Sequence, residues 1–184
     1  MLPDIALIGN KRTGKDTIAD YLVEKHGYTK LSFAEPLRKL AAEVNPCLPG
    51  GGRFNAKTNL IGYEWAKDEV PGYREFLEDL GLGARKVLGD YVWVDALDRR
   101  LYETAGPVVI TDVRFDNEGE YVHEHFEHEF LIVHVVRPDA PEPGAHESES
   151  RIALLAKAYA DTTLCNDADR DTLFAKVDRL LEGN

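Results

Sequence analysis

Residues 9–17 have the types and spacing that could bind phosphate. They read Gly9-Asn10-Lys11-Arg12-Thr13-Gly14-Lys15-Asp16-Thr17 and fit the pattern G-x-x-x-x-G-K of a phosphate-binding loop, or P-loop. Glycine lets the backbone fold tightly around phosphate oxygens, with its N–H groups pointing inward. The lysine of such a loop reaches the β- and γ-phosphates of a nucleoside triphosphate. The residues that we expect to contact this ligand are Gly9, Thr13, Gly14, Lys15, Asp16 and Thr17.

Asp16 departs from the usual form of this loop. It stands where a Ser or Thr normally meets Mg²⁺, and Thr17 follows it. A carboxylate at this position can hold Mg²⁺ directly or through water. An acidic residue in the first turn of a helix also stabilises the helix by itself. The sequence leaves both roles open for Asp16 and predicts phosphate or metal contact for Thr17.

A second acidic candidate, Asp112, follows the apolar run Val108-Val109-Ile110-Thr111. A hydrophobic strand that ends in Asp is typical of the element that holds Mg²⁺ in P-loop enzymes. Ligands of parallel α/β sheets bind at the carboxyl ends of the strands, so we expect Asp112 to lie near Lys15 and Asp16. The alternative is a helix-capping or turn residue.

Arginines follow several of the expected strands and loops. The guanidinium group suits phosphate because its planar fork gives paired donors, and it stabilises charge on a phosphoryl group in transfer. Taken one at a time, such arginines are most often surface residues. Arg12 lies inside the loop. Four other arginines are better candidates than Arg74 and Arg151, because they lie near expected strand ends and loop edges: Arg38, Arg85, Arg114 and Arg137.

Strands that alternate with helices must position these residues. Short apolar or alternating runs predict strands over 5–8, 28–33, 108–111, 130–136 and 162–165. Helical patterns cover 15–26, stopped by Gly27, and then 35–44, most of 63–102 with a break near Gly89, 116–127, 148–159 and the C-terminal segment. This order predicts an α/β fold whose five-stranded, mostly parallel sheet is covered by helices on both faces. Trp65 and Trp93 should lie in the core, with Trp93 alternatively a pocket wall.

Length and charge limit the partners of the chain. A chain of 184 residues suits one domain with an insert. Its 22 basic and 33 acidic residues leave a net charge of −11, which argues against a nucleic-acid polymer or a membrane surface as partner. There is no apolar run near 18 residues, and Cys47 and Cys165 are the only cysteines, so we expect a cytoplasmic protein. An anionic substrate would then require a local positive island.

Three histidines lie in an acidic stretch and invite a metal interpretation. His123, His125 and His128 do not share one helical face, because only the last two are neighbours at i, i+3. We therefore expect a solvated, acidic helix end rather than a metal site.

Taken in order, the motifs resemble the deoxynucleoside monophosphate (dNMP) kinases of tailed phages, from about Ile5 to Leu180. The motifs are the loop over 9–17, Phe33-Ala34-x-Pro36-Leu37-Arg38, Leu80-Gly81 with Arg85, Trp93-Val94, and Thr111-Asp112-Val113-Arg114-Phe115-x-Asn117-Glu118. The resemblance implies a three-layer P-loop kinase fold that transfers the γ-phosphate of ATP, with Mg²⁺, to a dNMP. It also implies a helical acceptor-binding insert over about 35–103, a lid over about 138–151, and a place in the host cytoplasm if a phage encodes the chain.

The resemblance also implies roles for single residues. Catalysis would fall to Lys15, Asp112, Arg114 and Arg137, with Asp16, Thr17 and Asp112 at the metal. Asn166 would lie near the base of ATP. The acceptor side would consist of Lys11, Arg12, Arg38, Arg74, Arg85, Trp93 and Arg114. Glu78 stands where the family often has Gln, which puts base selectivity in doubt because an ionised carboxylate cannot donate.

Other functions remain open at this stage. Another small-molecule P-loop kinase, acting on phosphomevalonate or dephospho-coenzyme A, is the first alternative. A non-catalytic nucleotide-binding module is the second, although a switch would not need so many acceptor-side arginines. The sequence leaves the oligomeric state open, including a homodimer.

Overall fold

The computed structural model describes residues 2–125, 129–140 and 151–183. The chain divides into two compact units. The first, here the sheet unit, combines Met1–Phe33 with Leu97–Asn184, and the second, here the helical unit, is Ala34–Ala96. Most of the expected lid, over 138–151, lies outside the described residues.

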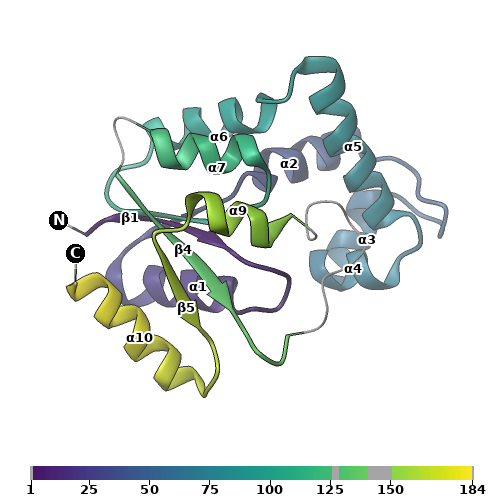
Figure 1. Ribbon diagram of the computed structural model, residues 1–184. Helices are drawn as coiled ribbons and strands as arrows, with labels where there is room; N and C mark the ends of the chain where they lie inside the picture. Colours follow the sequence, from purple (N-terminus) through teal and green to yellow (C-terminus); the bar gives the residue numbers. More distant parts are fainter. Residues whose placement is uncertain (1, 126–128, 141–150, 184) are drawn as a thin grey trace. The chain divides into compact units, whose positions relative to one another are not determined.

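The sheet unit contains the predicted five-stranded parallel sheet, which is confirmed (Figure 1). The strands lie in the order β2-β3-β1-β4-β5, and every pairing is parallel. Their bounds are Asp4–Ile8 for β1, Thr29–Leu31 for β2, Val108–Val113 for β3, Phe130–Val136 for β4 and Thr162–Cys165 for β5. All five carboxyl ends therefore lie at one edge of the sheet, where the P-loop follows β1.

Helices cover both faces of this sheet, which makes the unit a three-layer α/β sandwich (Figure 1). Helices α1 (Lys15–His26) and α10 (Arg170–Glu182) bury Ile18, Leu22 and Leu173 against the face that carries Ile5 and Leu7. Helices α7 (Asp116–Glu124) and α9 (Ile152–Tyr159) lie on the other face. Because successive residues of a strand point to opposite faces, a nearly continuous apolar strand such as β1 fits burial on both sides.

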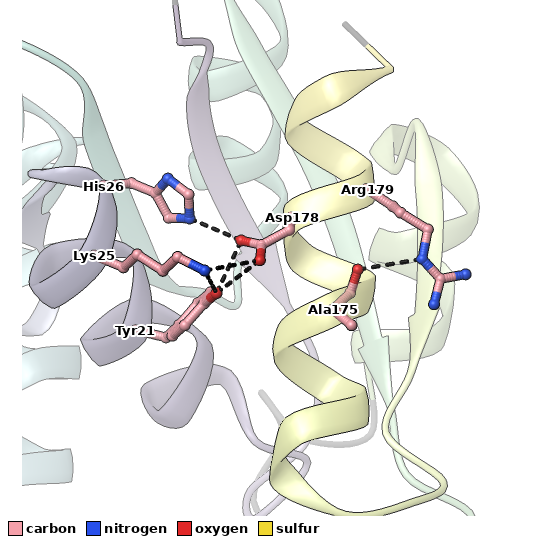
Figure 2. Close-up of polar contacts among 6 residues, drawn as sticks. All are labelled: Tyr21, Lys25, His26, Ala175, Asp178 and Arg179. Atoms are coloured by element: carbon pink, nitrogen blue, oxygen red, sulfur yellow. Dashed lines mark hydrogen bonds and ion pairs between the residues drawn. The ribbon is translucent and has the colours of Figure 1, made fainter.

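Helices α1 and α10 are joined at the end of α1 that lies away from the P-loop. The Tyr21 ring stacks on the Phe174 ring, with centroids 3.9 Å apart. Asp178 accepts hydrogen bonds from the Tyr21 hydroxyl at 2.9 Å and from Lys25 Nζ at 3.0 Å, and its Oδ1 lies 2.9 Å from His26 Nε2 (Figure 2). At the other end of α10, the Asp169 side chain accepts from the backbone N–H of Thr172. The helix is therefore attached to α1 through Phe174 and Asp178 and capped at its own N-terminus.

The helical unit is built around an aromatic core. It contains α2 (Ala34–Val44), α3 (Phe54–Ile61), α4 (Tyr63–Glu69), α5 (Tyr73–Leu88) and the start of α6 (Val92–Tyr102), which ends in the sheet unit. The ring of Phe54 stacks on that of Tyr73 at 4.3 Å, and Leu77 packs against them. The predicted break near Gly89 is confirmed, since Gly89 has a positive φ of 109°. The breaks at Gly62 and Gly72 were not predicted.

Some local predictions were wrong. Trp65 is 67% exposed and belongs to no core. The helix expected over 116–127 ends at Glu124. His125 is not solvated: its side chain is only 10% exposed, its Nε2 lies 3.4 Å from Asp98 Oδ1, and its ring lies against that of Tyr121. His128 lies outside the described residues. Within the described ranges, every helix is too short or too polar to cross a bilayer.

Candidate phosphate-binding site

The loop between β1 and α1 has a backbone that requires both of its glycines. Gly14 precedes α1 with a φ of 106°, in the region that favours glycine. A Cβ on Gly14 would lie 2.6 Å from Nδ2 of Asn166. A Cβ on Gly9 would lie 2.5 Å from the backbone oxygen of Val135 and 2.9 Å from Thr13 Oγ1. The spacing of the two glycines in the sequence therefore reflects close backbone approach at both positions.

The side chain of Lys15 folds back over this loop. Its Nζ donates to the backbone oxygens of Gly9 at 2.6 Å and of Asn10 at 2.7 Å, and the residue is 7% exposed. The same Asn10 oxygen accepts from the hydroxyl of Thr13 at 3.0 Å. The ammonium group is thus held at the start of the loop, at the carboxyl end of β1. Such a fixed charge can attract a phosphate group without first having to be positioned.

His134 is affected by this charge, and it belongs to none of the motifs found in the sequence. It is on β4, where it pairs with Ile8 of β1. Burial lowers the pKa of the His134 imidazole below its ordinary value, and the positive charge of Lys15 lowers this pKa further. At neutral pH the neutral form of the imidazole therefore predominates. The influence of Lys15 on His134 depends on how β1, β4 and α1 pack together. No local sequence pattern could therefore have predicted it.

Asn166 contacts the loop from the end of β5. Its backbone N–H donates to the oxygen of Val136 at 2.8 Å, which extends the pairing of β4 and β5 by one residue. Its Nδ2 donates to the backbone oxygen of Thr13 at 2.9 Å. The family resemblance implied a place for Asn166 near the base of ATP, and in the structure its side chain contacts the P-loop.

Asp16 and Thr17 lie in the first turn of α1. The Asp16 side chain is 81% exposed, and its Oδ1 lies 2.9 Å from Nζ of Lys30, which also contacts Asp20 at 2.9 Å. Thr17 is partly buried. The Asp16 carboxylate keeps oxygen lone pairs for another ligand.

Asp112 is turned toward the end of β2. Between Ala6 and Ile8 of β1 the pairing with β3 shifts from Ile110 to Val113, so β3 accommodates one extra residue beside the site. Such irregularities can aim a side chain in a new direction. Asp112 Oδ2 accepts from the hydroxyl of Ser32 at 2.7 Å, and its Oδ1 accepts from the N–H of Phe33 at 2.8 Å. The carboxylate therefore has a fixed orientation at the predicted edge of the sheet.

The basic candidates of the sheet unit follow the ends of β1, β3 and β4. Arg12 is exposed and has a positive φ of 66°, while Lys11 beside it is partly buried. Arg114 follows β3 directly, and its backbone N–H donates at 2.9 Å to a side-chain oxygen of the buried Glu118. Arg137 follows β4 and is exposed. These groups share one edge of the parallel sheet with Lys15.

The remaining candidates lie in the helical unit and have contacts there. The Arg38 guanidinium lies 5.4 Å from the centre of the Tyr63 ring. Arg74 forms an ion pair with Asp68, and Arg85 Nη1 donates to the backbone oxygen of Asp90 at 2.7 Å. Trp93 is 6% exposed and its Nε1 donates to the oxygen of Gly81 at 3.2 Å. The ion pair of Arg74 competes with its predicted role at an acceptor.

Arg151, in the sheet unit, lies 3.8 Å from Asp116.

Comparison with known proteins supports the fold over nearly the whole chain. No family model matches the sequence. A protein of Acanthamoeba polyphaga mimivirus named "Putative deoxynucleotide monophosphate kinase" is 27% identical over 198 residues, covering 94% of this chain and 93% of that protein.

Solved structures of P-loop kinases resemble the chain in fold. Shikimate kinase from Acinetobacter baumannii has a TM-score of 0.53 at 14% identity, covering 100% of this chain and 96% of its own. Dephospho-CoA kinase from Campylobacter jejuni has a TM-score of 0.52 at 13% identity, covering 97% and 95%. The chain therefore has the fold of P-loop kinases.

Proposed function

We propose that the protein is a kinase that transfers the γ-phosphate of ATP to a deoxynucleoside monophosphate, producing ADP and the deoxynucleoside diphosphate. The observation that carries the proposal is the loop between β1 and α1. There Lys15, the first residue of the 12-residue helix α1, has its buried ammonium group held by the oxygens of Gly9 and Asn10. Similarity over 94% of the chain to a protein named for this activity supports the choice of acceptor.

The residues of the loop fit the phosphates of ATP. A Cβ on Gly9 or Gly14 would lie within 2.6 Å of another atom. The loop therefore has no room for a side chain at either position. Backbone N–H groups in such a loop, together with the positive end of α1, bind phosphate oxygens. In addition, Oδ1 of Asn10 is buried and accepts no hydrogen bond from the described residues. A hydroxyl or water molecule that accompanies a bound nucleotide would satisfy this oxygen.

Two carboxylates and one hydroxyl fit Mg²⁺. Asp16, Thr17 and Asp112 supply oxygen atoms, which Mg²⁺ prefers, and this ion is commonly bound through one or two carboxylates plus nucleotide phosphates. No cluster of three His, Cys, Asp or Glu residues suited to a metal occurs in the described ranges, so phosphates and water would complete the set. When bound, Mg²⁺ neutralises charge on the β- and γ-phosphates.

The residues of this chain would act mainly by positioning and by charge. Lys15 would hold the γ-phosphate, while Arg12, Arg114 and Arg137 would stabilise the charge that spreads over the phosphoryl group in transfer. The attacking oxygen of a monophosphate is already anionic, so no strong general base is required. Holding donor and acceptor in line would then supply much of the rate enhancement.

Acceptor binding would use basic side chains and one aromatic ring. Residues assigned to it are Lys11, Arg12, Arg38, Arg74, Arg85, Trp93 and Arg114. Residues 138–151 would exclude water from the transfer as a lid. Glu78, in place of an amide, would select for bases that offer a hydrogen-bond donor.

An ADP-release assay with separate acceptors tests the proposal. The panel contains the four common dNMPs, the matching ribonucleotides, phosphomevalonate, dephospho-coenzyme A and shikimate. We expect release with at least one dNMP and none with the last three. Turnover with phosphomevalonate or dephospho-coenzyme A alone would instead establish the first alternative. Calorimetry that detects ATP-analogue binding but no dNMP binding in its presence would establish the non-catalytic module.

A further inference from the structure

The contact between Asn166 and the P-loop suggests a role beyond nucleotide-base recognition. Asn166 Nδ2 donates to the backbone oxygen of Thr13 at 2.9 Å, across 153 positions of the sequence. Asn166 is itself held in place, because its backbone N–H donates to Val136 at the end of β4. The donor is therefore fixed to the sheet rather than carried by a free loop.

The oxygen that Asn166 holds belongs to the peptide group between Thr13 and Gly14. A trans peptide is planar, and its C=O and N–H point in opposite directions. Holding the Thr13 oxygen toward Asn166 therefore turns the Gly14 N–H away from Asn166. N–H groups of this part of a P-loop are the ones that face phosphate oxygens.

Gly14 gives the Thr13–Gly14 peptide group unusual conformational freedom, and the contact with Asn166 restricts that freedom. With a φ of 106°, Gly14 adopts a conformation that few other residues tolerate, but glycine alone would also sample others. The space beside Gly14 is filled by Asn166, whose Nδ2 lies 2.6 Å from the position of a Cβ, and by Leu173 at 3.9 Å. The hydrogen bond and the packing thus act on the same peptide group.

We infer that Asn166 is a positioning residue, which fixes the Thr13–Gly14 peptide so that the Gly14 N–H faces the phosphates of the nucleotide. The inference rests on the nucleotide-binding part of the proposed function and not on the identity of the acceptor. It differs from the predicted contact with the base of ATP, because it assigns the effect to phosphate binding.

Calorimetry with two separate probes distinguishes these roles. The probes are inorganic tripolyphosphate, which has no base, and adenosine, which has no phosphate. For Asn166→Ala, which removes the donor without adding charge, we expect tripolyphosphate affinity to fall about tenfold, the scale of one hydrogen bond. Adenosine affinity should stay unchanged. Asn166→Gln, which keeps an amide donor, should recover part of the tripolyphosphate affinity.

A control variant on the same connection separates positioning from general stability. Lys176 Nζ donates to the oxygen of Cys165 at 2.8 Å, one residue before Asn166, and has no described contact with the P-loop. Lys176→Met should lower the melting temperature and leave both affinities unchanged. Unchanged tripolyphosphate affinity in folded Asn166→Ala, or an equal loss in Lys176→Met, would overturn the inference. Loss of adenosine affinity alone would also overturn it. None of these results depends on whether a dNMP is the acceptor.

Discussion

The Ser32 hydroxyl donates a 2.7 Å hydrogen bond to Oδ2 of Asp112, joining the end of β2 to β3. The Phe33 N–H donates to the other oxygen of Asp112, and these two donors are of different kinds. One is a backbone donor, which cannot reverse, and the other is a hydroxyl, which can both donate and accept. This difference allows the charge of Asp112 to be removed without breaking these two hydrogen bonds.

Asp112→Asn should therefore keep the fold and lose turnover. The amide oxygen can accept from Phe33, and the amide nitrogen can donate to the Ser32 oxygen. We expect a nearly unchanged melting temperature and a fall in kcat of roughly 100-fold, because the variant lacks the carboxylate charge that we propose acts on Mg²⁺. Asp112→Ala, by contrast, leaves the Phe33 N–H unpaired and should cost about 1–3 kcal/mol of stability. Wild-type kcat in Asp112→Asn would reduce Asp112 to a structural anchor.

Lys15→Met should abolish most of the turnover while the protein still folds. Methionine keeps the unbranched shape in the buried position but supplies no charge for the γ-phosphate. We expect kcat to fall roughly 100- to 1,000-fold, with the circular dichroism spectrum unchanged. Lys25→Met on the same helix, where Lys25 contacts Asp178, is the matched control and should keep its activity. A Lys15→Met enzyme with normal turnover would contradict the proposed site.

Acid should destabilise the protein through His134. Its pKa in the folded state is lowered from 6.5 by burial and by Lys15, so the unfolded chain takes up this proton first as the pH falls. Stability that is present above pH 6.5 should then decline as the pH drops below it. Thermal unfolding of His134→Gln should show a weaker decline between pH 7.5 and 5.5. The exposed His123→Gln is the control, and equal slopes for both variants would refute the assignment.

Two glycine-to-alanine changes should shift stability in opposite directions. In Gly9→Ala the new Cβ meets the backbone oxygen of Val135 at 2.5 Å, and β4 cannot move away cheaply. We expect a loss of about 1–3 kcal/mol in urea unfolding. In Gly83→Ala, on α5, no atom lies within 4 Å of the new Cβ, so alanine should add about 0.5–1 kcal/mol through its helix propensity. Shifts of the same sign would show that the crowding at Gly9 does not decide its stability.

The parts of the fold that were predicted are those with local signals. The apolar runs gave all five strands, and Gly27, with a φ of 74°, ends α1 where the sequence placed its stop. Helix α3 was missed because it has no clear apolar stripe: only Phe54 is buried, whereas Leu60 is 77% exposed.

In the site, too, the residues that could be predicted are those whose partners lie nearby in the sequence. Gly9, Gly14 and Lys15 could be recognised because the geometry that they need lies within seven consecutive residues. The contact of Asn166 with Thr13 and that of Ser32 with Asp112 join positions 153 and 80 residues apart, so their partners could not be read from spacing. The ion pair of Arg74 with Asp68 likewise depends on the turn between α4 and α5, which no motif specified.

The strand order β2-β3-β1-β4-β5 has a consequence for how the chain is made. The central strand, β1, ends at Ile8, but neither of its neighbours is translated until about 100 residues later, because β3 begins at Val108 and β4 at Phe130. At roughly 5–20 residues per second the ribosome needs about 5–20 s to reach β3. The whole helical unit, which ends at Ala96, is synthesised in that interval, before either strand that pairs with β1. The phosphate-binding loop is therefore synthesised early and assembled late.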